Sequence, residues 1–172
     1  MLDLDRMESG RMKLNYGTVD LNALVVDVVE RFGPTTQLHH FVTALAPDLG
    51  SIQADSDKLT QVISNLLTNA IKYAPKGGEV VLTTWAEGDD VAMSVKDEGL
   101  GVPSEALETI FERYARHEAK DRELIKGTGL GLPVVRQIVE MHGGRVWVEN
   151  NGAERGATFT FQIPRQQPDA VG

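Results

Sequence analysis

The hydrophobic and polar positions of the chain change between a helical and a strand period along its length. Apolar residues at helical spacing predict helices over residues 21–33, 56–73, 104–114 and 131–142. The second of these is the best supported, because Asp55 or Ser56 stands at its start as an N-cap and residues 75–78 end it with Pro and Gly. Runs rich in β-branched residues predict strands at residues 16–21, 39–46, 51–55, 78–86, 91–96, 145–150 and 156–164.

The order of these elements predicts an α/β fold. The runs on either side of the turn sequence EGDD (87–90) form one β-hairpin, and the last two strands form another. Hairpins without a strict βαβ rhythm are typical of a two-layer α/β sandwich, with a mixed, largely antiparallel sheet covered on one face by helices. The polar stretch 115–129 has no apolar period and predicts a long loop of the kind that often carries function. Residues 165–172 predict a disordered tail.

Composition narrows the range of functions. The chain has 172 residues, a formal net charge of −8 and no cysteine. This length suits one domain with a hydrophobic core. The lack of cysteine excludes disulfides and Cys-based zinc sites, and an acidic balance without a basic block argues against non-specific nucleic-acid binding. No apolar run approaches the roughly 20 residues of a membrane span, and the N-terminus is too charged for a signal peptide.

Polar residues in the helix over 56–73 gather on one side of it. With about 100° per residue and Asn65 as the reference, Asn69 lies at about 40°, Lys72 at about −20° and Tyr73 at about 80°. A solvated helix edge is one interpretation, although Lys and Glu would suit it better than Asn. A ligand site is the other, because amide oxygens suit Mg²⁺ and an ammonium group contacts phosphate oxygens. Spacing alone favours the solvated edge.

A first glycine-containing loop begins with Asp97 at the end of an apolar strand, where a carboxylate is costly unless it is paired. The carboxylate could accept from an exocyclic amine, while Gly99 and Gly101 let a flat ring approach the backbone. A simple Asx turn is the alternative, and the short Asp-x-Gly pattern by itself favours that turn.

A second loop has Gly127, Gly129 and Gly131 in alternation before a helix. Backbone amides at a helix N-terminus bind phosphate well. The spacing matches neither the P-loop nor the dinucleotide fingerprint. By itself this loop is weak evidence for a phosphate site, and a flexible segment followed by a helix start is the alternative.

Taken together and in order, several segments carry a family resemblance. They are NLLTNAIKY (65–73), DEGLGVP (97–103), IFERYAR (110–116), GTGLGL (127–132) and a C-terminal stretch over 142–164. In this order they resemble the N box, the first G box, the F box and the second G box of the ATP-binding domain of sensor histidine kinases. The resemblance covers about residues 17–164 and implies the Bergerat-type ATP-binding fold shared with gyrase, heat-shock chaperone and mismatch-repair ATPases.

The resemblance implies a use for the polar side of the helix. Asn69 would coordinate a Mg²⁺ ion that bridges the ATP phosphates, and Asn65 would support the metal or its water. Lys72 would contact phosphate, and Tyr73 would pack near the ribose and phosphates. Asn65, Lys72 and Arg116, the last near the γ-phosphate, would be the catalytic residues of a protein histidine kinase, whose chemistry depends on positioning and charge stabilisation.

The resemblance also implies roles for the loops. Asp97 would accept from the adenine amino group, with Gly99 and Gly101 shaping the pocket. Residues 112–126 would form an ATP lid anchored by Phe111. The second glycine loop would hinge this lid and offer amides to the phosphates, through Gly127, Thr128, Gly129, Leu130 and Gly131.

Kinases of this kind phosphorylate a histidine on a dimerising two-helix hairpin that precedes the ATP-binding domain. Residues 1–16 resemble the end of the second hairpin helix. The histidines of the chain stand in no phosphoacceptor setting, and we expect a structural or solvated role for His39, His40, His117 and His142. The expected partners are ATP, the phosphoacceptor hairpin of the same kinase and a response regulator, with no nucleic acid and no membrane contact. We expect a cytoplasmic monomer, from a parent protein that is either membrane-anchored or soluble.

Two alternatives to a kinase stay open. A nucleotide-binding regulatory module would lack transfer activity, although the intact motifs and Arg116 argue against it. Another ATPase of the same fold, such as a gyrase-like subunit, would usually carry a Glu four residues before the Mg-binding Asn to activate water. This chain has Asn65 at that position, which favours transfer to a protein acceptor.

Overall fold

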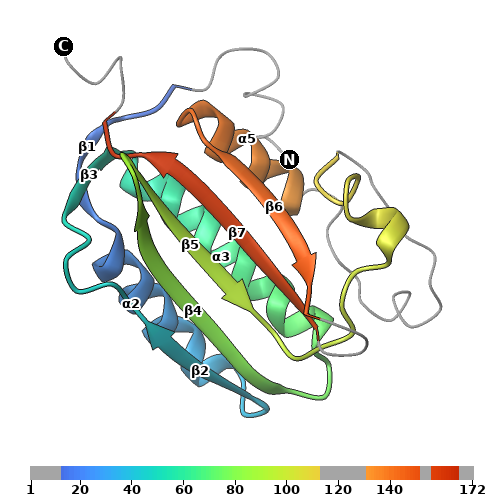
Figure 1. The fold of residues 1–172 in the computed structure, drawn as a ribbon. Helices are drawn as coiled ribbons and strands as arrows, with labels where there is room; N and C mark the ends of the chain where they lie inside the picture. Colours follow the sequence, from blue (N-terminus) through green and yellow to red (C-terminus); the bar gives the residue numbers. More distant parts are fainter. Residues whose placement is uncertain (1–12, 113–130, 152–155, 167–172) are drawn as a thin grey trace.

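A five-stranded mixed sheet forms one layer of the computed structural model (Figure 1). The structure describes residues 13–112, 131–151 and 156–166. The strand order is β2-β4-β5-β7-β6, in which β2 and β4 are parallel and the other neighbours antiparallel. Both predicted hairpins, β4–β5 and β6–β7, are confirmed. The strands are β2 (His39–Ala44), β4 (Gly78–Glu87), β5 (Asp90–Lys96), β6 (Arg145–Asn150) and β7 (Ala157–Pro164).

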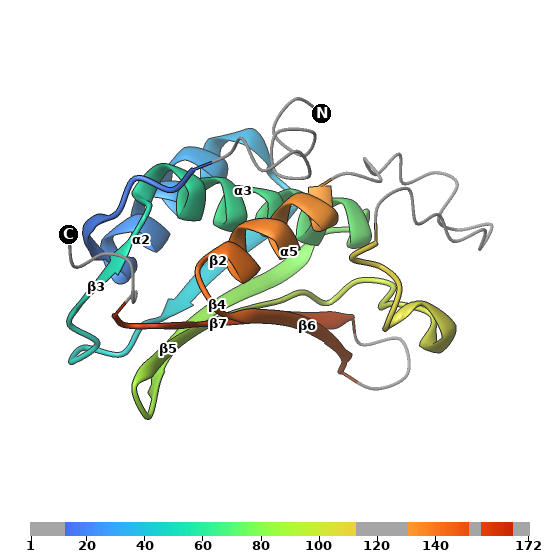
Figure 2. The ribbon, with the colours of Figure 1, turned by 90° about the horizontal axis from the view of Figure 1, so that it is seen from above.

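Helices cover one face of this sheet, as Figure 2 shows. They are α2 (Leu21–Phe32), α3 (Ser56–Tyr73) and α5 (Gly131–Met141). Two short strands, β1 (Gly17–Asp20) and β3 (Ser51–Ala54), pair antiparallel as a separate ribbon. The predicted two-layer α/β sandwich is therefore confirmed. Within the described ranges, no helix has the length and apolar character needed to cross a membrane.

α3 forms where the sequence predicts it, and its start is determined locally. Asp55 is the N-cap, since its Oδ1 accepts a 3.1 Å hydrogen bond from the Lys58 amide. A cap of this kind contributes about 1 kcal/mol to stability. An apolar arc of α3 is buried in the core and comprises Leu59, Val62, Ile63, Leu66, Leu67 and Ala70. Burial of this arc fixes the rotation of the helix and therefore the direction in which its polar side faces.

The prediction of a helix over residues 104–114 is wrong for the part that the structure describes. Ser104–Ala106 form a short 3₁₀ helix, and turns continue to Phe111. The Thr109 and Glu112 amides donate to carbonyls three residues earlier, at 3.1 and 2.9 Å. The apolar residues of this segment are spaced as in a helix, but they reach the core from a series of turns. The buried residues are Ala106, Ile110 and Phe111.

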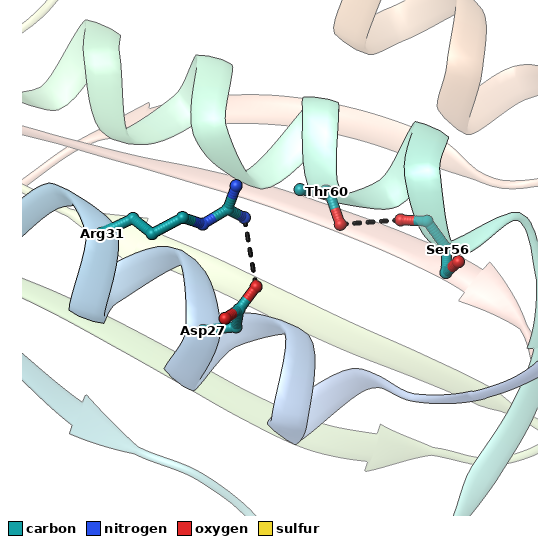
Figure 3. Close-up of polar contacts among 4 residues, drawn as sticks. All are labelled: Asp27, Arg31, Ser56 and Thr60. Carbon is teal, nitrogen blue, oxygen red and sulfur yellow. Dashed lines mark hydrogen bonds and ion pairs between the residues drawn. The ribbon is translucent and has the colours of Figure 1, made fainter.

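Local polar contacts lie on the outer sides of α2 and α3 (Figure 3). Arg31 and Asp27 form an i,i+4 ion pair with 3.2 Å between Nη2 and Oδ2, and both side chains are more than half exposed. Thr60 Oγ1 donates to the Ser56 carbonyl at 2.8 Å, one turn earlier on α3. Exposed helix ion pairs contribute roughly 0.3–0.5 kcal/mol, so this surface adds little to stability and offers sites for control substitutions.

His142, just after α5, connects three parts of the fold from a fully buried position. Its Nε2 accepts a 3.1 Å hydrogen bond from the Asp55 backbone amide, and its Nδ1 therefore donates to the Ile138 carbonyl at 2.8 Å. Tyr16 lies edge-on to the ring, with 6.1 Å between ring centroids, and the Asn15 amide donates to Asp55 Oδ2 at 2.8 Å. Asn15 and Tyr16, just before β1, are thus fastened to the start of α3 and the end of α5.

The buried imidazole makes stability depend on pH. Burial lowers the pKa of His142 below its ordinary value of 6.5, against the opposite effects of the Ile138 carbonyl and the Asp55 carboxylate. The folded state therefore binds this proton more weakly than the unfolded state. The stabilising contribution is fully present above pH 6.5 and is lost as the pH falls from there toward the lowered pKa.

We expect the free energy of unfolding to fall more steeply between about pH 7 and pH 5 for the wild type than for His142→Gln. The variant lacks the His142 imidazole and keeps all other titrating groups, so the difference between the two proteins reports on His142 alone. Urea denaturation of both proteins across this range measures the difference. Parallel curves for the two proteins would show that His142 does not titrate as described.

Candidate functional site

The polar side of α3 carries Asn65, Asn69 and Lys72, all of them half-buried. Asn65 Nδ2 donates to the Gly131 carbonyl at 3.2 Å, and Asn69 Nδ2 donates to the Asn65 carbonyl at 2.8 Å. Because a carbonyl can only accept, these bonds identify the Nδ2 end of both side-chain amides and leave each Oδ1 as the atom that can accept. The first bond also joins the polar side of α3 to the first residue of α5.

Asp97 follows β5 and is fully buried. Its Oδ1 accepts from the Gly99 amide at 2.8 Å and from the Ala157 amide at 3.4 Å. Its Oδ2 is buried as well and accepts no hydrogen bond from the described residues. The Gly99 bond is the Asx turn that the sequence offered as an alternative. Complete burial of the carboxylate is a cost that an ordinary turn does not require, so the turn is part of a more specialised arrangement.

The end of α3 lies directly against the loop that follows β5. The Leu100 amide donates to the Tyr73 carbonyl at 2.9 Å. A Cβ added at Gly99 would lie 2.0 Å from that same carbonyl oxygen, a distance that real Cβ atoms essentially never show. Glycine thus permits a close approach here, and the approaching group is the end of α3; the predicted approach of a flat ring stays a prediction.

His39 also contacts the end of α3. Its Nε2 contacts the Ala74 carbonyl at 2.7 Å and must donate to it, so its Nδ1 accepts from Thr36 Oγ1 at 2.7 Å. His40, the next residue of β2, is exposed, as expected for strand neighbours that point to opposite faces. His39 and His142 thus have structural settings, and His117 lies outside the described residues.

Several predicted site residues also lie outside the described residues: Arg116, Gly127, Thr128, Gly129 and Leu130, with residues 113–126 of the expected lid. The same holds for residues 1–12 of the expected hairpin remnant and for residues 167–172 of the tail. Gly131 is described and begins α5. Phe111, the expected lid anchor, is buried and meets Phe159 edge-on, with 6.0 Å between ring centroids.

Sequence reasoning missed the residues that hold the loop after Asp97. Asn150 ends the predicted strand over 145–150, Asn151 follows it, and Gly156 begins the predicted strand over 156–164; all three contact this loop. Asn and Gly beside a strand are ordinary turn signals. Nothing in the local pattern indicates that their partners lie near residue 100.

A family comparison agrees with this geometry. Residues 54–167 match the model of the histidine kinase-, DNA gyrase B- and HSP90-like ATPases. The chain therefore belongs to this family of ATP-binding proteins. The matched range contains α3, the loop over residues 97–102 (the Asp97 loop) and α5, the three segments that the hydrogen bonds bring together.

Individual relatives place the chain among sensor histidine kinases. The sensor histidine kinase WalK of Bacillus subtilis is 31% identical over 170 residues, which cover 97% of this chain and 28% of WalK. The nucleotide-free catalytic domain of histidine kinase ThkA superposes with a TM-score of 0.78 at 29% identity, covering 89% of this chain and 99% of that domain. Full-length ShkA in complex with AMPPNP gives a TM-score of 0.80 at 32% identity, covering 95% of this chain and 34% of ShkA.

These matches define the chain as the catalytic ATP-binding domain of a two-component sensor histidine kinase. The chain spans 28% of the length of WalK, 22% of the kinase CikA of Synechococcus elongatus and 18% of the sensor protein KdpD of Clostridium acetobutylicum. The family assignment thus concerns a catalytic domain. The family and the fold that the ordered motifs predicted are both confirmed.

We expect Gly99→Ala to lower the free energy of unfolding by roughly 1–3 kcal/mol, because its Cβ would collide with the Tyr73 carbonyl and the backbone would have to move. Gly33→Ala is the matched control, since nothing lies within 4 Å of a Cβ at that position. Urea denaturation of the two variants beside the wild type measures the cost. Equal stabilities for both variants would disprove the tight contact.

Proposed function

We propose that this domain binds Mg-ATP between the polar side of α3 and the loop after β5, and transfers the γ-phosphoryl group to a histidine of a dimerisation hairpin. One observation carries this proposal: α3 bonds to the start of α5 through Asn65 and to the Asp97 loop through Tyr73. A single helix thereby joins the candidate phosphate-binding residues to the candidate base-binding carboxylate.

The phosphate end of the proposed site combines neutral oxygens, one cation and a helix start. The amide oxygens of Asn69 and Asn65 suit Mg²⁺, which takes few protein ligands beside the phosphates of its nucleotide. Bound Mg²⁺ would neutralise charge on the phosphate oxygens during transfer. Lys72 adds a cation on the same side of α3, and Gly131 begins a helix whose first amides favour phosphate. Arg116 and residues 127–130 would complete this end.

The base end of the proposed site is built around the buried Asp97. Its carboxylate would accept from the amino group of adenine, a hydrogen bond that a base with a carbonyl in that place does not offer. Gly99 and Gly101 would shape the pocket by letting the loop lie against the Tyr73 carbonyl and against Asn150, and Tyr73 would pack near the ribose. The hydrogen bonds to Gly99 and Ala157 support this role, because they hold the carboxylate in one orientation.

The phosphoryl acceptor in this proposal is a hairpin histidine of the same kinase, and residues 1–16 would be the end of the second hairpin helix. A response regulator would receive the group next. The domain itself would be a cytoplasmic monomer that contacts neither nucleic acid nor membrane.

The metal role of Asn69 has a direct test. We expect Asn69→Ala to weaken ATP binding about 10- to 100-fold in the presence of Mg²⁺, and to have little effect in EDTA. Isothermal titration calorimetry under both conditions measures this. Thr60→Ala is the control, because Thr60 lies on the same helix about 180° around its axis. If Asn69→Ala instead unfolds the domain, or if wild-type binding ignores Mg²⁺, the metal site is wrong.

Transfer activity requires a separate test against the two alternatives. With the hairpin of the kinase added in trans and labelled ATP, we expect acid-labile phosphohistidine on the hairpin, and much less of it with Lys72→Ala. ATP binding without transfer would favour a regulatory module. Rapid phosphate release without the hairpin would favour an ATPase of the gyrase-like kind.

A further inference from the structure

Two adjacent asparagines at the end of β6 bind both ends of the Asp97 loop, which comprises residues 97–102. Asn150 Oδ1 accepts from the Val102 amide at 2.8 Å, and Asn150 Nδ2 donates to the Val102 carbonyl at 2.6 Å. Asn151 Nδ2 donates to the Asp97 carbonyl at 3.2 Å. The two side chains therefore reach the first and the last residue of the loop.

These bonds replace strand pairing where the sheet ends. The β5–β7 ladder runs to the pair Lys96 and Thr158, and the Asp97 amide adds one bond to the Ala157 carbonyl at 3.0 Å. Beyond that point the loop leaves β7, yet Val102 is 3% exposed and its backbone groups need partners. The side-chain amide of Asn150 supplies one donor, Nδ2, and one acceptor, Oδ1. A neighbouring strand would offer the same pair of groups through its backbone.

The second asparagine is itself held in place. Thr158 Oγ1 donates to Asn151 Oδ1 at 2.6 Å, and the Asn151 amide donates to the Gly156 carbonyl at 3.0 Å. These contacts leave the Asn151 Nδ2 group directed at the Asp97 carbonyl. The orientation of this side chain thus comes from the β6–β7 hairpin and not from the loop that it binds.

Glycines bring the loop and the hairpin into direct backbone contact. Gly156 has φ +84°, and a Cβ there would lie 2.1 Å from the Asp97 carbonyl oxygen. Gly101 has φ +75°, and a Cβ there would lie 3.0 Å from Asn150 Oδ1. Such close packing means that the loop can move little unless the asparagine bonds are released first.

We propose that Asn150 and Asn151 are positioning residues that set the preference of the site for adenine. This inference rests on the proposed role of Asp97 in receiving the adenine amino group. The asparagines act through the Asp97 loop, since each bonds to its backbone. Asn65, Asn69 and Lys72 lie on α3, a different element whose position is set by its buried arc. Releasing the loop therefore disturbs base recognition and leaves phosphate binding intact.

The test compares nucleotides in the wild type, Asn150→Ala and Asn151→Ala by calorimetry with Mg²⁺. We expect the Kd for ATP to rise about tenfold in each variant, the equivalent of about one to two hydrogen bonds. The Kd values for GTP and for tripolyphosphate should change less than twofold, so the preference for ATP over GTP falls by the same tenfold. Glu149→Gln is the matched control, because Glu149 is an exposed neighbour on the same strand.

The remaining outcomes are distinct. Equal weakening of ATP and tripolyphosphate, or an unchanged ATP preference in folded variants, would overturn the positioning role alone. A wild-type domain that binds no ATP would overturn the proposed function as well. Thermal unfolding without nucleotide checks that each variant is folded. If Asn150→Ala does not fold, Asn150→Ser keeps one hydroxyl for Val102 and should show a smaller loss of ATP preference, whereas full retention of that preference would contradict the inference.

Discussion

The contact between the end of α3 and the Asp97 loop is the constraint on which the site depends. The hydrogen bond from the Leu100 amide to the Tyr73 carbonyl joins two elements that are positioned by different means. The core sets the place of α3, and the sheet sets the place of β5 and therefore of Asp97. Because Gly99 has no side chain, the two backbones meet directly. The distance between the proposed phosphate end and the proposed base end of the site is thus fixed by the fold.

α3 is held at both ends by histidines from elsewhere in the chain. His142 accepts from the Asp55 amide at the start of the helix, and His39 donates to the Ala74 carbonyl at its end. A helix end leaves backbone groups without intrahelical partners, and these two imidazoles each satisfy one of them. The polar side of α3 therefore keeps its orientation without a contribution from a bound ligand.

The charge of the chain gives a second constraint. A domain with a formal net charge of −8 gains no general attraction for a nucleotide triphosphate. Binding must come from groups placed close to the ligand, and the proposed site answers this with amide oxygens for a metal ion, the Lys72 ammonium and the start of α5. The buried Asp97 would lie at the base end of this proposed site, where its carboxylate would not oppose the phosphates.

The sequence by itself determined the features that depend on residues close together along the chain, namely most of the helices and strands and the motifs. Helical and strand periods predicted α3, α5 and both hairpins, and the order of the motifs identified the family. The helical spacing over 104–114 misled, because three residues can reach the core from a chain of turns as well as from a helix. Only the tertiary structure brought Asn150 to Val102, 48 residues away, and His39 to Ala74, 35 residues away. These contacts are hydrogen bonds between side chains and distant backbone groups. They do not depend on the hydrophobic periodicity of either segment, so the local sequence pattern does not predict them.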